Sequence, residues 1–268
     1  MGKNEFLEVA SCRSSGLGII YDLDGTLLDS LQDLGETANE VLLELNLPLL
    51  PMFVYRDLVG NGIAELCRRA IALAILVEKQ TCFNAEQTAF LPGVLELVRT
   101  QSQRPKLDQK TEDISVASFY SRYQTNWQRN TRPFPQVNEL LEQLAAAGFS
   151  QALISNKADA FVKEIVDQYF SPSLFDVVMG QLDHIPSKPS PVGPLLVAER
   201  WEIEPESILF IGDSDVDMHT AKAAGMIPVA VSWGFRDRDE LIQAGGQHIL
   251  ESPLELIDLL RQIISHTM

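Results

Sequence analysis

Long apolar runs, cysteines and positive charges are scarce in this sequence. No uninterrupted apolar segment is long enough to cross a lipid bilayer, and the first residues, MGKNEFLEVASCRSSG, lack the hydrophobic stretch of a signal peptide. The three cysteines, Cys12, Cys67 and Cys82, lack the spacing of a zinc site, and their odd number does not suit a disulfide framework. These absences predict a soluble, cytoplasmic protein that does not associate with membranes.

The shortage of basic residues narrows the choice of partner. The chain has 21 Lys and Arg against 37 Asp and Glu, which gives a formal net charge of −16 at pH 7. This balance argues against nucleic acid as a partner, and it would repel an anionic substrate at long range. A phosphate-binding site in this chain must therefore be made locally positive by a bound cation or by well-placed lysines.

The chain of 268 residues, 46% of them hydrophobic, is long enough for a core domain with a smaller satellite. Short apolar runs that alternate with amphipathic patterns predict a Rossmann-like α/β core, in which helices flank a parallel sheet. The expected strands are 17–21, 151–154, 176–179, 207–211, 227–231 and, more weakly, 248–250. The expected helices are 137–147, 158–169, 194–201, 216–224 and 253–265.

A long interval separates the first expected strand from the second. Helical patterns cover 31–45, 63–77 and 112–129, and the polar segment 101–110 is expected to be a loop. We interpret residues 31–132 as a small helical cap domain inserted after the first strand. Residues 17–30 and 133–268 would then form the catalytic core, and residues 1–16 an N-terminal extension.

Charged and polar residues follow several of the expected strands. Because ligands bind at the carboxyl ends of parallel strands, these side chains should converge in one crevice. Carboxylates that meet there repel one another unless a hard cation such as Mg²⁺ holds them, and a lysine would offset more of the charge. The residues that follow strands are Asp22, Asp24, Ser155, Asn156, Lys157, Asp213 and Asp217, and Lys188 precedes the helix that leads into the strand at 207–211.

The residue types in this group suit phosphoryl transfer. A carboxylate beside a bound phosphoryl group can act as a nucleophile and form an aspartyl phosphate. A second aspartate two residues further on, as Asp24 is to Asp22, can serve as general acid and base. The simpler interpretation, a polar turn after a buried strand, stays open on these two residues alone.

Four segments, in order, resemble the four motifs of the haloacid dehalogenase (HAD) superfamily. They are DLDGTLLDS, SNK, the lysine of SKPSP, and GDSDVD. The resemblance runs from about residue 17 to the C-terminus, and its wider context is similar to the phosphoglycolate phosphatase-like branch. This branch carries a helical cap after the first motif, as expected here for residues 31–132.

The resemblance implies a set of catalytic and metal-binding roles. Asp22 would be the nucleophile and a metal ligand, and Asp24 the general acid and base, with its backbone carbonyl on the metal. Lys188 would neutralise charge between the nucleophile and the phosphate. Asp213 would bind Mg²⁺ directly, and Asp217 would assist indirectly or through water, although it could also only cap its helix.

Further residues are implied in substrate binding. Thr26 would lie beside the phosphate, which Ser155 and the Asn156 backbone would hold. The last two could also cap the following helix, which does not exclude phosphate binding. In the cap, Gly60 and Asn61 of LVGNGIAELCRRA would belong to a substrate-facing loop, unless Gly-Asn-Gly is only a turn.

The resemblance implies a Mg²⁺-dependent phosphatase acting on a small phosphorylated metabolite, with 2-phosphoglycolate as the leading candidate. The alternatives are a phosphosugar mutase, a pyrophosphatase or nucleotidase, and, last, a non-catalytic phosphate-binding module. One departure bears on the substrate: relatives carry an acidic residue shortly after the Lys-Pro pair, where this chain has Val192 and Gly193.

Overall fold

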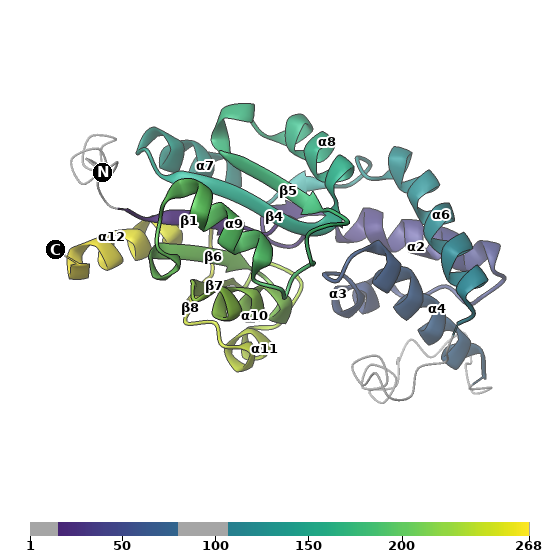
Figure 1. Cartoon of the computed structure of the whole chain (residues 1–268). Helices are drawn as coiled ribbons and strands as arrows, with labels where there is room; N and C mark the ends of the chain where they lie inside the picture. Colours follow the sequence, from purple (N-terminus) through teal and green to yellow (C-terminus); the bar gives the residue numbers. More distant parts are fainter. Residues whose placement is uncertain (1–15, 80–106, 268) are drawn as a thin grey trace. The chain divides into compact units, whose positions relative to one another are not determined.

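The computed structural model describes residues 16–79 and 107–267, which form two compact units (Figure 1). One unit joins the residues up to Asp29 to those from Arg132 onward, and the other is Ser30–Thr131. Almost all of the expected N-terminal extension, and residues 101–106 of the expected loop, lie outside the described residues. In the described part of the chain, no helix has the length and apolar character that crossing a bilayer requires.

The first unit contains a six-stranded parallel sheet in the order β5-β4-β1-β6-β7-β8. Strand β1 (Gly18–Tyr21) is fully buried and lies between β4 and β6, so its carboxyl end is at the centre of the sheet. The prediction of an α/β core with a parallel sheet is therefore confirmed. The remaining strands are β4 (Ser150–Ala158), β5 (Val177–Gln181), β6 (Ile208–Gly212), β7 (Ile227–Val231) and β8 (His248–Leu250).

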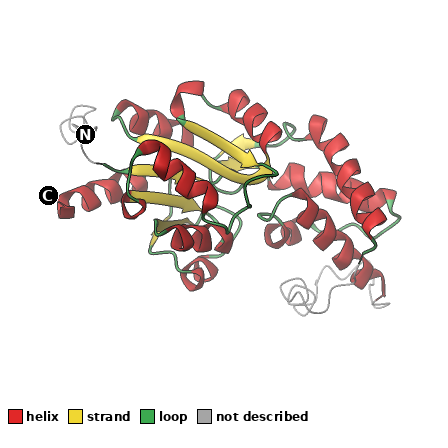
Figure 2. Ribbon diagram, viewed as in Figure 1, coloured by secondary structure: helices red, strands yellow, loops and turns green. Residues whose placement is uncertain are grey.

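Helices cover both faces of this sheet (Figure 2). Helices α9 and α10 pack on the face that carries Ile20 and Phe210. On the other face, a small apolar cavity is lined by Tyr21, by Leu140 from α7 and by Leu256 from α12. The helices are α7 (Val137–Ala146), α8 (Asp159–Tyr169), α9 (Val192–Trp201), α10 (Asp215–Ala224), α11 (Arg238–Ala244) and α12 (Glu255–Thr267), with 3₁₀ turns η4 (Pro172–Leu174) and η5 (Pro205–Ser207).

Strand β4 is longer than the sequence predicts. The expected strand ended at residue 154, but β4 runs to Ala158, with an irregular register against β5 between Ile154 and Ala158. The polar residues that were expected after the strand thus belong to its last part. The apolar run ends earlier because side chains at the carboxyl end of a parallel strand face the crevice rather than the core.

The second unit, Ser30–Thr131, is helical in its described part. Helix α2 (Leu31–Glu44) packs against α4 (Ile63–Lys79) and α6 (Gln109–Asn126), and η2 (Met52–Val54) leads into the short α3 (Tyr55–Leu58). The expected start of α6 at residue 112 was wrong by three residues. Asp108 caps this helix by accepting the N–H of Thr111, a capping signal that lay inside the segment interpreted as a loop.

Asp33 links the beginning of the second unit to its end. Its buried carboxylate accepts the backbone N–H groups of Asn130 and Thr131, the Asn130 side-chain amide and the Thr131 hydroxyl, at 2.8–3.0 Å. Just outside this unit, β2 (Leu28–Asp29) pairs antiparallel with β3 (Arg132–Pro133). The two points where the chain leaves and re-enters the first unit are therefore held next to each other.

Candidate active site

Three buried carboxylates gather at the carboxyl ends of β1 and β6. Asp22 extends the ladder of β1, since its N–H donates to the Ile211 carbonyl at 2.9 Å, and Asp213 directly follows β6. Each of Asp22, Asp213 and Asp217 offers an oxygen within 4.8 Å of those of the other two. None of the three is more than 6% exposed. The expected convergence of motifs far apart in sequence is thus present within this unit.

Lys188 bridges two of these carboxylates. Its Nζ lies 2.7 Å from Asp22 Oδ1 and 2.7 Å from Asp217 Oδ1, and the residue is 5% exposed. Burial on its own lowers the pKa of the Lys188 ammonium, but the Asp217 and Asp22 carboxylates outweigh burial and leave the pKa above its ordinary value. The lysine therefore stays charged between the two aspartates.

The carboxylates carry more negative charge than Lys188 offsets. Burial, with the neighbouring Asp217 and Asp213 charges, raises the pKa of Asp22 well above its usual range despite the attraction of Lys188. Burial and Asp217 raise the pKa of Asp213 to about 7, even with Arg236 nearby. Three carboxylates and one bridging ammonium leave an excess that a divalent cation would balance. An all-oxygen donor set of this kind suits Mg²⁺.

Asp213 and Asp217 are held in different ways. Asp213 accepts the Phe235 N–H at 2.7 Å and the Thr26 hydroxyl at 3.4 Å. The Gly25 backbone approaches it so closely that a Cβ there would lie 2.2 Å from Asp213 Oδ2, and Gly25 also has a φ of +88°. Only glycine fits this turn, which directly follows Asp24.

Asp217 forms a capping box with Ser214 at the start of α10. Its Oδ2 accepts the Ser214 N–H at 3.1 Å and the Ser214 hydroxyl at 2.6 Å, while Oδ1 binds Lys188. Both oxygens are therefore engaged by protein donors. The geometry favours Asp217 as the residue that holds Lys188 and the loop after β6, rather than as the main metal ligand.

Thr26 lies in the same turn and is buried. Its hydroxyl is directed to Asp213, and its carbonyl accepts the indole N–H of Trp233 at 3.0 Å. The structure thus associates Thr26 with the carboxylate cluster. Its expected contact with a phosphate stays a prediction.

Asp24 is paired with Lys157, a lysine to which the sequence analysis assigned no role. Lys157 Nζ lies 2.5 and 2.8 Å from the two carboxylate oxygens of Asp24, and Lys157 is only 4% exposed. A signal was available, because SNK ends in this lysine and Tyr21 of β1 is in register with Leu153 of β4. Three residues further along both strands, this register places Asp24 opposite Asn156, the neighbour of Lys157.

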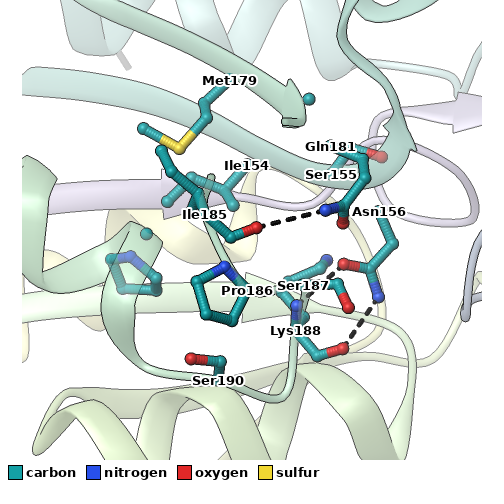
Figure 3. A pocket seen from close by; sticks show the side chains of 13 residues that line it. Ile154, Ser155, Asn156, Met179, Gln181, Ile185, Pro186, Ser187, Lys188 and Ser190 are labelled. Atoms are coloured by element: carbon teal, nitrogen blue, oxygen red, sulfur yellow. Dashed lines mark hydrogen bonds between the residues drawn. The ribbon is translucent and has the colours of Figure 1, made fainter. Parts of the chain in front are cut away.

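Asn156 holds the loop that carries Lys188. Its side-chain oxygen accepts the Lys188 N–H at 2.8 Å, and its amide donates to the Lys188 carbonyl at 3.0 Å (Figure 3). Neither Ser155 nor Asn156 caps α8, whose cap residue Ala158 makes no side-chain bond. Asn156 thus orients Lys188, and Ser155 accepts the Lys157 N–H at 3.2 Å.

A small pocket lies next to the loop that Asn156 holds. Ser155, Lys188 and Gly193 line it. Gln181 holds its wall by donating to the Ile185 carbonyl (Figure 3) and to the Leu182 carbonyl. The unusual Val192-Gly193 pair forms the first turn of α9, and Pro194 is tolerated there because a first-turn N–H needs no helical partner. The departure from the usual motif therefore leaves Lys188 bound to both aspartates.

Gly60 and Asn61 lie between α3 and α4 in the second unit. Gly60 has a φ of +117° and Gly62 a φ of +83°, so the segment is a turn that glycine favours. Their expected role in substrate binding stays a prediction, as does the role of residues 31–132 as a cap.

The comparison with known proteins agrees with the motifs. The haloacid dehalogenase-like hydrolase family matches residues 19–231. A phosphoglycolate phosphatase of Shigella boydii is 34% identical over 218 residues, which cover 81% of this chain and 82% of the relative. One of Vibrio vulnificus is 27% identical over 241 residues, 90% of this chain and 94% of the relative.

Among solved structures, a predicted phosphoglycolate phosphatase from Haemophilus somnus has a TM-score of 0.77 and 25% identity, covering 92% of this chain and 99% of that one. The fold, the order of the motifs and these relatives all agree. The chain belongs to the haloacid dehalogenase-like hydrolase family.

Proposed function

We propose that this protein is a Mg²⁺-dependent phosphatase that hydrolyses a small phosphomonoester, with 2-phosphoglycolate as the leading substrate. The observation that carries the proposal is the position of Asp22, a buried carboxylate bound by Lys188 and next to Asp213. The family and the named activity of its relatives support the reaction type. A cytoplasmic location remains part of this proposal.

The donor set fits a magnesium ion. Asp22 and Asp213 would supply carboxylate oxygens, Asp24 its backbone carbonyl, and Asp217 would keep Lys188 and the loop after β6 in place. When bound, the ion would neutralise charge on the phosphoryl group and hold it in position. It would also balance the excess carboxylate charge at this site.

In the first half-reaction, a carboxylate oxygen of Asp22 attacks phosphorus while the bond from phosphorus to the leaving oxygen breaks. Asp24, in its protonated form, gives a proton to that oxygen. The product is an aspartyl phosphate and a free alcohol. Lys188 and Ser155 stabilise the negative charge of the transferring group.

In the second half-reaction, a water molecule attacks the aspartyl phosphate. Asp24 takes a proton from this water, the bond between phosphorus and the Asp22 oxygen breaks, and inorganic phosphate leaves. The Asp22 carboxylate is regenerated. Asp24 thus acts as acid in one step and as base in the next. This requires its carboxyl group to lie near Asp22, within reach of the leaving oxygen and of the attacking water.

The test is phosphate release from a panel of esters, with and without Mg²⁺, by wild type and Asp22→Asn. The panel holds 2-phosphoglycolate, sugar phosphates, nucleotides and pyrophosphate. We expect Mg²⁺-dependent release from 2-phosphoglycolate, and a loss of at least about a thousandfold in Asp22→Asn because the nucleophile is gone. Asp183→Asn, a change on the loop after β5, is the control with wild-type turnover.

Other outcomes would change the assignment. An Asp22→Asn rate equal to wild type contradicts the mechanism. Isomerised sugar phosphate without free phosphate indicates a mutase, and preferred release from pyrophosphate or nucleotides changes the substrate only. Binding of Mg²⁺ and phosphate without turnover of any panel member would leave a binding module.

A further inference from the structure

The pairing of Lys157 with Asp24 has a feature that its structural role alone does not require. Both oxygens of Asp24 face one ammonium, at 2.5 and 2.8 Å, and the Lys157 side chain is 3% exposed. Burying an ammonium removes its hydration, which opposes folding. Neutral donors would hold a carboxylate at lower cost, as they do for Asp33 in the same chain.

Local positive charge at this place matters for substrate capture. The chain carries a net charge of −16, and Asp22, Asp213 and Asp217 gather beside the reaction centre. Lys188 is already committed to Asp22 and Asp217. These carboxylates would repel an anionic group on the departing part of the substrate, and a cation on the Asp24 side would offset that repulsion.

The position of Lys157 follows from the role of Asp24. A group that protonates the leaving oxygen lies within hydrogen-bond reach of it, about 3 Å away. In an ester of a 2-hydroxy carboxylic acid, the carboxylate carbon is only two bonds from that oxygen. The ammonium that touches both oxygens of Asp24 is therefore within reach of the carboxylate of such a leaving group.

We propose that Lys157 determines specificity for the leaving group. It selects phosphate esters in which a carboxylate is attached to the carbon that bears the ester oxygen. The ammonium would be shared between Asp24 and the substrate carboxylate, since an ammonium has three donors and acts as a point charge. This inference rests on the proposed function and adds to it the residue that recognises the carboxylate of the leaving group.

The test compares two substrates that differ only at this group: 2-phosphoglycolate, and 2-hydroxyethyl phosphate, in which a neutral CH₂OH replaces the carboxylate. The enzymes are wild type, Lys157→Gln and Lys157→Arg. Lys163→Gln is the matched control, because it removes an exposed lysine that pairs with Asp159 on α8. We expect wild type to prefer 2-phosphoglycolate in kcat/KM.

Lys157→Gln should lose at least about tenfold more kcat/KM on 2-phosphoglycolate than on 2-hydroxyethyl phosphate, as expected for a lost hydrogen bond between charged groups. Lys157→Arg should keep most of the preference, and Lys163→Gln all of it. Equal losses on both substrates overturn the inference and leave Lys157 as a residue that acts only through Asp24. No release from either substrate by wild type would instead overturn the proposed function.

A binding measurement separates recognition from turnover. Calorimetry with Asp22→Asn and with Asp22→Asn/Lys157→Gln, both in Mg²⁺, gives the affinity for each ester without hydrolysis. We expect Lys157→Gln to lower the affinity for 2-phosphoglycolate by at least about tenfold, while the affinity for 2-hydroxyethyl phosphate changes by no more than about twofold. An unchanged ratio of the two affinities contradicts the inference even if turnover is lost.

Discussion

Each of the two units buries aspartates, but the units satisfy them in different ways. In the helical unit, Asp33 is surrounded by N–H and hydroxyl donors from Asn130 and Thr131. In the unit with the sheet, Asp22 and Asp217 share a single ammonium, and Asp213 lies beside them. Asp33 is thus held by neutral donors and stands apart from other carboxylates. Asp213 and Asp217 also accept neutral donors, but together with Asp22 they form a cluster of three carboxylates around one ammonium.

The difference separates a structural carboxylate from a functional one. A buried charge that is fully hydrogen-bonded fixes a local geometry and needs no further ligand. Carboxylates placed together against their own repulsion keep an unbalanced negative charge, which is costly until a cation binds. Burial alone would not have distinguished the two kinds of site, because Asp33 is as buried as Asp213.

The largest effect on stability is expected at Asp33. Asp33→Ala leaves the N–H groups of Asn130 and Thr131 without this acceptor, so the free energy of unfolding of the helical unit should fall by about 2–4 kcal/mol. Urea unfolding followed by the fluorescence of Trp127, with Trp201 and Trp233 changed to phenylalanine, reports on this unit.

The matched control for that change is Asp113→Ala, which removes an exposed carboxylate from α6 in the same unit. It should change the unfolding free energy by no more than about 0.5 kcal/mol. An Asp33→Ala protein as stable as this control would mean that the neutral donors do not depend on Asp33, and the contrast with the carboxylate cluster would fail.

The core of the fold was predictable because hydrophobic periodicity is local. The expected strands at 227–231 and 248–250 match β7 and β8, and the fold class followed from alternation. The end of β4 was not predictable in this way, since polarity at a crevice looks like a loop. The start of α6 was missed because a capping aspartate also occurs in turns.

The candidate site was predictable only as far as motifs reach. Asp22, Lys188, Asp213 and Asp217 were chosen from their motifs and lie together. The hydrogen-bond and ion-pair partners of the site residues were not predicted, because such pairing depends on strand register between segments that are distant in sequence. The lysine on Asp24 and the amide of Asn156 on the Lys188 loop belong to this class.

A smaller effect, on activity, is expected at Asn156. Asn156→Ala removes the two hydrogen bonds from its side chain to the Lys188 backbone, so kcat/KM on the best panel substrate should fall roughly tenfold to fiftyfold, or about 1.4–2.3 kcal/mol. Gln181→Ala, which loosens the same loop at Ile185, should cost less.

A double-mutant cycle shows whether Asn156 acts through Lys188. In a Lys188→Met background, Asn156→Ala should have little further effect on kcat/KM, because the ammonium that it positions is gone. Additive losses would instead place Asn156 in direct contact with the substrate. Circular dichroism and thermal unfolding of each variant check that the fold persists.

The smallest effect tests the charge excess itself. Burial raises the pKa of Asp213 to about 7 in the metal-free protein, so its carboxyl holds a proton below that pH and Mg²⁺ must displace it. Since the folded pKa lies above the unfolded value, Asp213 favours folding at acidic pH, and this contribution is lost as the pH rises through about 7. Mg²⁺ should offset the loss, so the gain in unfolding free energy on adding saturating Mg²⁺ should be about 1 kcal/mol larger at pH 8 than at pH 6.

Thermal unfolding with and without Mg²⁺ at the two pH values measures this difference. Asp213→Asn should abolish this difference between the two pH values. Asp33 is already satisfied by neutral donors, so it should not contribute to the gain in unfolding free energy on adding Mg²⁺. A gain that is equal at both pH values, or larger at pH 6, would mean that the carboxylate cluster does not bind the cation as a deprotonated group.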